Sequence, residues 1–168
     1  MGFSACGGPE VRVERAPQLE LSTYKTFSWA PVKQLEQPKE FTTRRDDLLD
    51  HQIKTQVNEA LKKQGLTEVT QSPALQVAYS VRVINSMEVT PGYYPEPYYS
   101  YWGDQPVNRL VEKKQGTVDI DLVDAKTGRL VWRGIAVSDV NDTGPSTKQV
   151  QESVAKILTD LPGQTKTG

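Results

Sequence analysis

The chain has 168 residues but only one cysteine, Cys6, and only one histidine, His51. A lone cysteine excludes an internal disulfide, and a lone histidine excludes a histidine-rich metal site. No apolar run approaches the roughly 18 residues that a membrane-spanning helix needs. With 20 basic and 21 acidic residues, the formal net charge is -1, which gives no electrostatic basis for binding nucleic acid.

The sequence motifs of common enzymes are also missing. The chain carries no glycine-rich phosphate loop, no Gly-x-Ser-x-Gly elbow and no Cys-x-x-Cys pair. His51 lies two residues from Ile53, which belongs to the apolar stripe of an expected helix, so its side chain should face solvent. The sequence therefore predicts a protein that is not an enzyme, with no catalytic residue, no metal site and no cofactor.

The segment around Cys6 resembles the end of a bacterial lipoprotein signal. Residues 3–8 read Phe-Ser-Ala-Cys-Gly-Gly, with small residues before the cysteine and glycines after it. The five residues before Cys6 cannot hold the basic and apolar regions of an export signal, so we expect a longer precursor. We predict that Cys6 is the lipid (palmitate) attachment site, and Gly7 is compatible with sorting to the outer membrane. The alternative is an incidental thiol in an N-terminal tail.

The periodicity of the apolar residues predicts one α+β domain. Alternating residues predict strands, and apolar residues at helical spacing predict two helices with one apolar stripe each. The expected strands are 11–14, 24–29, 66–70, 74–89, 116–124 and 129–137, and the expected helices are 45–64 and 146–161. Burying both stripes requires two layers, with the two helices packed on one face of a mainly antiparallel sheet.

Local signals indicate where these elements end. Thr43 is the expected N-cap of the first helix and Gly65 its stop, while Ser146 and Gln149 have the spacing of a capping box. Pro91 is expected to end the strand 74–89. We divide the chain into a signal remnant and tether (1–10), a single domain (11–162) and a flexible tail (163–168).

Several of these segments resemble one family. Residues 21–29, Leu-Ser-Thr-Tyr-Lys-Thr-Phe-Ser-Trp, match its N-terminal stretch, and residues 116–134 match its "GtvxidlvDaktgxlvWrG" hairpin. The family is DUF4136, bacterial lipoproteins of unknown function, and the resemblance extends from Val11 to Pro162. It implies an exported, lipid-anchored α+β domain and no particular activity. The chain departs from the family at Arg15 and Ala74, where acidic residues are common.

Residues 91–106 form a segment rich in proline and aromatic residues. Five of the seven tyrosines lie here, together with a tryptophan: Tyr93, Tyr94, Tyr98, Tyr99, Tyr101 and Trp102. Prolines restrict the backbone, and tyrosine and tryptophan are enriched at interfaces, so the segment is a candidate loop for binding an envelope protein, a glycan or the lipid interface. The alternative is a disordered or self-packed insertion between two strands.

Acidic residues gather near the predicted hairpin: Asp119, Asp121, Asp124, Asp139 and Asp142. Two carboxylates on one strand face can serve acid–base chemistry or bind a metal. Asp119 and Asp121, however, alternate with the apolar face, so we expect them in solvent, offset by Arg129 and Arg133. Asp124 should accept N–H bonds of the turn that ends at Gly128.

Two functional hypotheses follow from these patterns. The first is a lipid-anchored lipoprotein of the bacterial cell envelope, on the periplasmic face of the outer membrane, that acts as a binding or structural module. The second is a hydrolase or metal-dependent enzyme that uses the strand carboxylates. A projecting aromatic loop would favour the first, and converging carboxylates in a closed pocket would favour the second.

Overall fold

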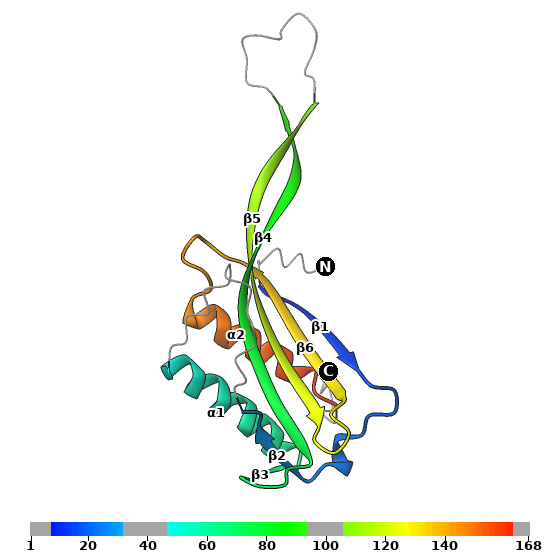
Figure 1. Ribbon diagram of the computed structural model, residues 1–168. Coiled ribbons are helices and arrows are strands. Elements are labelled where there is room, and N and C mark those ends of the chain that lie inside the picture. Colours follow the sequence, from blue (N-terminus) through cyan, green and yellow to red (C-terminus); the bar gives the residue numbers. More distant parts are fainter. Residues whose placement is uncertain (1–7, 32–46, 94–105, 163–168) are drawn as a thin grey trace, which may run out of the picture.

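The computed structural model describes residues 8–31, 47–93 and 106–162. It has two layers, a six-stranded mixed sheet with two helices on one face, which confirms the predicted α+β class (Figure 1). The expected Thr43 cap and the tail 163–168 lie outside the described residues. Neither helix in the described ranges has the length and apolar character needed to cross a membrane.

The order of strands in the sheet is β1-β6-β5-β4-β2-β3. The pairs β1–β6, β6–β5 and β5–β4 are antiparallel, and β2 runs parallel to both β4 and β3. The elements are β1 (Glu10–Arg15), a short 3-10 turn (Leu21–Thr23), β2 (Thr26–Trp29), α1 (Asp47–Lys63), β3 (Thr67–Glu68), β4 (Leu75–Tyr93), β5 (Pro106–Asp124), β6 (Leu130–Asp139) and α2 (Thr147–Thr159).

The core lies between the sheet and the two helices. Alternate residues of β5 supply Val118, Ile120 and Leu122, and the adjoining β6 supplies Trp132, all fully or almost fully buried. The stripes of both helices cover them, because residues three and four apart share a helix face. Asp119 and Asp121 therefore lie on the opposite face of the sheet.

The predicted end signals of the two helices are confirmed where the structure describes them. The Ser146 hydroxyl accepts from the Gln149 N–H, and the Gln149 side chain accepts from the Ser146 N–H, which completes the capping box of α2. Gly65 follows α1 with a positive φ of 89° and donates its N–H to the Lys62 carbonyl. His51 is exposed, as expected.

The structure corrects the prediction for residues 91–106. Strand β4 continues through Pro91 to Tyr93, and β5 begins at Pro106, ten residues before the predicted start. Pro91 is tolerated because β5 is the only described neighbour of β4 at this level, so half of the backbone N–H groups need no partner in the sheet. Residues 94–105 lie outside the described residues.

Beyond the last pair with β6, β4 and β5 therefore form a two-stranded ribbon that projects from the body (Figure 1). We call residues 85–93 and 106–114 the arm. Nine paired rows, from Asn85↔Lys114 to Tyr93↔Pro106, give it a length of about 30 Å.

Candidate functional site

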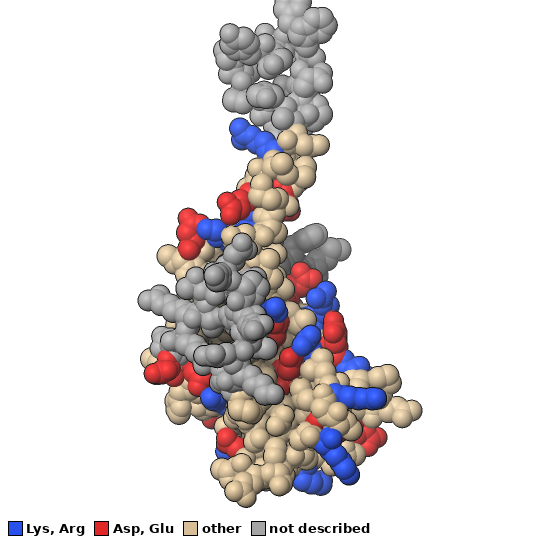
Figure 2. All heavy atoms as spheres, viewed as in Figure 1, with Lys and Arg blue, Asp and Glu red and all other residues tan. Residues whose placement is uncertain are grey.

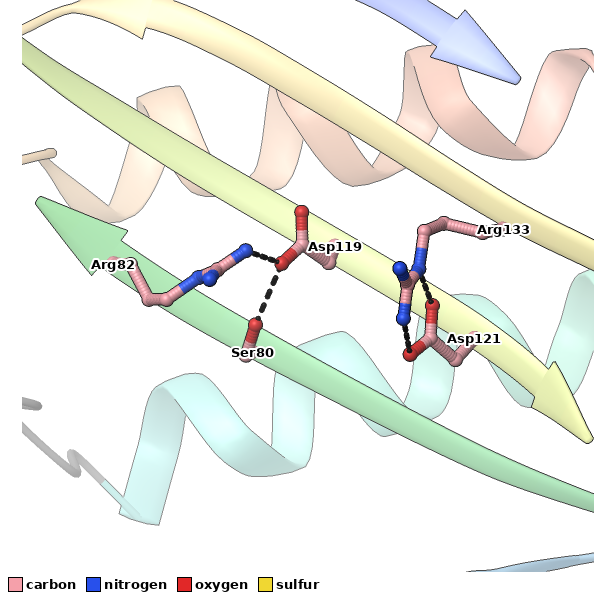
Figure 3. Close-up of polar contacts among 5 residues, drawn as sticks. All are labelled: Ser80, Arg82, Asp119, Asp121 and Arg133. Atoms are coloured by element: carbon pink, nitrogen blue, oxygen red, sulfur yellow. Dashed lines mark hydrogen bonds and ion pairs between the residues drawn. The ribbon is translucent and has the colours of Figure 1, made fainter. Parts of the chain in front are cut away.

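The sheet face opposite the helices carries two carboxylate–guanidinium pairs (Figure 3). Arg82 of β4 and the Ser80 hydroxyl both donate to the Asp119 Oδ2 of β5, the hydroxyl from 2.9 Å. Arg133 of β6 holds both oxygens of Asp121, with distances of 2.7 and 2.9 Å. Each carboxylate has its own cationic partner, an arrangement typical of structural ion pairs.

The prediction that Asp119 lies in solvent was wrong. Only 7% of the residue is exposed, and its Oδ1 is buried without a hydrogen-bond partner among the described residues. Arg82, rather than Arg129, is its ion-pair partner, because β4 is paired with β5 on this side. Asp121 behaves as expected: it is partly exposed and bound by Arg133, and this carboxylate raises the pKa of Arg133.

The remaining acidic residues serve separate local structures. Asp124 accepts from the N–H groups of Lys126 (2.8 Å) and Thr127 (3.0 Å) and from the Tyr24 hydroxyl (2.9 Å). The Thr127 N–H and then the Tyr24 hydroxyl lower the pKa of Asp124, whereas burial and then this hydrogen bond raise the pKa of Tyr24. The turn ends at Gly128, with a φ of 70°, as predicted.

Asp139 and Asp142 lie at the base of the arm. Asp139 is 3.4 Å from the Lys113 Nζ, and Asp142 is 2.7 Å from the Lys114 Nζ. These contacts raise the pKa of both lysines and lower the pKa of Asp142. Within the described ranges, the five aspartates therefore do not converge, and no three potential ligands gather in one place to hold a metal ion.

A cluster around Trp29 was not predicted from the sequence. Its indole N–H donates to Asn58 (2.9 Å), and its ring meets Tyr79 edge-to-face with centroids 6.0 Å apart. The Tyr79 hydroxyl donates to Asp50 over 2.5 Å, and the Lys54 ammonium lies 5.6 Å from the indole centroid. The cluster joins β2, β4 and α1, so its evident role is to hold α1 against the sheet edge.

The arm is the least covered part of the described structure. Met87, Val89, Leu110 and Val111 are 63, 56, 67 and 47% exposed. The space-filling view shows charged side chains over the body and the lower arm, and a largely uncharged upper arm (Figure 2). A two-stranded ribbon with exposed apolar residues and free edges is a surface suited to contact with something else.

Of the predicted binding residues, the structure places only one. Tyr93 is the last residue of β4, whereas Tyr94, Tyr98, Tyr99, Tyr101 and Trp102 lie outside the described residues. Cys6 also lies outside them. The described chain begins beside the arm, because β1 starts where β4 and β5 leave the body (Figure 1).

Three solved structures are similar to this chain at low sequence identity. A PDZ domain protein from Parabacteroides distasonis is 16% identical, with a TM-score of 0.60, and the match covers 94% of this chain and 37% of that one. A DUF4136 family protein from Bacteroides thetaiotaomicron is 15% identical, with a TM-score of 0.48 and coverage of 90% and 95%. The PelC dodecamer from Paraburkholderia phytofirmans is 13% identical, with a TM-score of 0.46 and the same coverage.

The comparison with curated proteins gives no match. The family model of a domain of unknown function, DUF4136, matches residues 11–163, which is almost the whole of the described body and arm. The chain therefore belongs to the DUF4136 family.

Proposed function

We propose that this chain is a lipid-anchored lipoprotein of the bacterial cell envelope, held on the periplasmic face of the outer membrane. The position of Cys6 carries the proposal: it follows two small residues and stands only four residues before β1 begins at Glu10. A lipid on this thiol would hold the folded body next to the membrane, and several acyl chains bind a bilayer firmly.

In this proposal the body is a scaffold and the arm is its contact surface. The exposed residues Met87, Val89, Leu110 and Val111 support a role in binding or in envelope structure, since projecting apolar surface of this kind marks an interaction site. The aromatic sequence between the two strands of the arm adds residue types that are enriched at interfaces.

The enzyme alternative has less support. Asp119 and Asp121, the pair that could have acted as acid and base, are each bound to an arginine. A pair poised for proton transfer would instead face a substrate cavity with its oxygens available.

Labelling with palmitate tests the anchor. The protein is produced in bacteria from a precursor with an export signal, and the membrane fraction is examined for label. We expect label on the wild type, and we expect Cys6→Ala to remove the label and release the protein into the soluble fraction. Ser4→Ala is the matched control and should keep both. Equal labelling of wild type and Cys6→Ala would refute the proposal.

A further inference from the structure

The arm changes in polarity along its length. Its inner rows carry the charged residues Glu88, Glu112, Lys113 and Lys114. Lys113 forms ion pairs with Glu88 of the opposite strand and with Asp139 at the base, and Lys114 forms one with Asp142 at the base. The outer rows, from Val89↔Leu110 onward, contain a single charged residue among those described, Arg109. The described outer part of the arm is therefore almost uncharged, whereas the inner part carries several charged side chains.

The exposed apolar side chains of the arm occur on both faces of the ribbon. Val89 and Leu110 are directly paired and share one face with Met87, while Val111, which pairs with Glu88 in the next row inward, points to the other. All four side chains are exposed. The arm thus carries exposed apolar residues on both faces, in the three rows where its charged inner part meets its outer part.

The chain enters the body at the end from which the arm projects. Glu10 pairs with Val137, two residues before β6 ends at Asp139 and the arm begins. The Pro9 carbonyl accepts from the Lys156 Nζ of α2 at 3.0 Å, which fixes the entry point. The segment that leads back to Cys6 therefore starts beside the base of the arm.

The distance from Cys6 to the arm is short. Three residues lie between Cys6 and Glu10, so the four steps from one Cα to the next span at most about 14 Å. The base of the arm on β5 is two strands away from β1, a further distance of about 10 Å. A lipid on Cys6 would keep this base within about 24 Å of the bilayer surface, less than the arm's own length of about 30 Å.

We infer that the outer arm lies in the headgroup region of the bilayer that holds the lipid on Cys6. This inference rests on the anchor proposed above. Val89, Leu110 and Val111 enter the interface, and Arg109 reaches the anionic headgroups as its aliphatic stem follows them. Insertion stops at this depth because the outer edges of the ribbon carry free backbone N–H and C=O groups, which hydrocarbon cannot satisfy.

A bilayer explains the arm better than a second copy of the chain does. Contact between two ribbons buries one face or one edge, and it calls for an apolar stripe that follows the strands. In the arm, the charged residues instead gather in the inner rows and only Arg109 is charged in the described outer rows, so charge falls off along the axis, as it does on the way into a membrane approached end-on.

The lone thiol allows a direct test that does not depend on lipidation in the cell. Purified protein is coupled through Cys6 to maleimide-bearing lipid in vesicles of phosphatidylethanolamine and phosphatidylglycerol. Amide hydrogen exchange of residues 85–93 and 106–114 is then compared with that of the free protein. We expect exchange in the outer arm to slow by about tenfold on vesicles, while exchange in the body stays unchanged.

Two variants make the result specific. Val89→Ser combined with Leu110→Ser should abolish the slowing, whereas Leu130→Ser, an exposed leucine at the opposite end of the sheet, should keep it. Unchanged arm exchange on vesicles would overturn the inference while leaving palmitate labelling of Cys6 unaffected. Slowing that grows with the density of protein on the vesicle would also overturn it, because it would indicate contact between copies.

Discussion

Gly134 of β6 lies so close to Ile157 of α2 that a Cβ at position 134 would come within 2.2 Å of the Ile157 Cγ2. The same Cβ would lie 2.7 Å from the Cη2 of Trp132, which is itself buried. The helix and the sheet are therefore in contact at a point where only a hydrogen fits. This contact sets how closely α2 packs, and a glycine in a strand often marks such an approach.

Gly134→Ala should destabilise the fold because the added methyl group has no space. We expect a loss of about 1–3 kcal/mol in the free energy of unfolding, the usual cost of overpacking a core. Urea denaturation followed by circular dichroism measures it.

A double-mutant cycle identifies the cause. Ile157→Ala alone should cost about 2–5 kcal/mol by leaving a cavity. In the double variant the new methyl occupies part of that cavity, so the combined loss should be smaller than the sum of the two single losses. Strict additivity would show that Gly134 is required for another reason.

The second prediction concerns the dependence of stability on pH. Because hydrogen bonds lower the pKa of Asp124 in the folded state, its ionisation stabilises the fold. This contribution is complete above the unfolded pKa of about 4 and is lost as the pH falls through the folded pKa. Asp124→Asn should therefore be less stable than wild type at neutral pH, and the difference should shrink steadily in acid. A difference independent of pH would contradict this.

Tyr24 gives the complementary test at alkaline pH. Its pKa is raised in the folded state, so its contribution is present below the unfolded pKa of about 10 and is lost as the pH rises through the folded pKa. Tyr24→Phe should remove this alkaline loss, which makes its stability flatter than that of wild type above about pH 10. Thermal unfolding across the alkaline range measures the effect.

Sequence periodicity predicted the elements that have a buried face. Val118, Ile120 and Leu122 alternate because one side of β5 packs against helices, and this pattern was sufficient to identify the hairpin. The capping box of Ser146 and Gln149 was also predictable, because it depends on residues three apart in the chain.

The arm was not predictable in the same way. Both of its faces are open, so it has no reason to alternate apolar and polar residues. Pro91 predicts the end of a strand, but it is tolerated inside β4 because the strand has one described neighbour there. The burial of Asp119 was missed for a different reason. Alternation predicts which face a residue occupies, but Arg82, which covers it, comes from a strand 37 residues earlier.

The ion pair of Arg82 and Asp119 should stabilise the fold because it compensates the charge of the buried Asp119 carboxylate. Arg82→Met leaves the buried carboxylate with only Ser80, and we expect a loss of about 1–2 kcal/mol, reduced from the fully buried case because the arginine side chain is 43% exposed. Arg133→Met should cost less, since Asp121 is more exposed than Asp119.

A paired replacement tests that explanation. Arg82→Met combined with Asp119→Val removes both charges and should restore stability to within about 1 kcal/mol of wild type. Chemical denaturation of wild type, Arg82→Met and the double variant gives the comparison. If the double variant were as unstable as Arg82→Met alone, the unpaired carboxylate would not be the source of the loss.

Finally, the body should fold without the arm. Replacing residues 87–112 by Asn-Gly joins Ser86 to Lys113, which are already paired, through a turn that suits a two-residue hairpin. All the side chains described between these positions are exposed, so the core loses nothing, and the Lys113–Asp139 contact remains. We expect cooperative thermal unfolding with a midpoint within about 5 °C of wild type. Loss of cooperativity would mean that the arm stabilises the body, and it would no longer be a separate contact element.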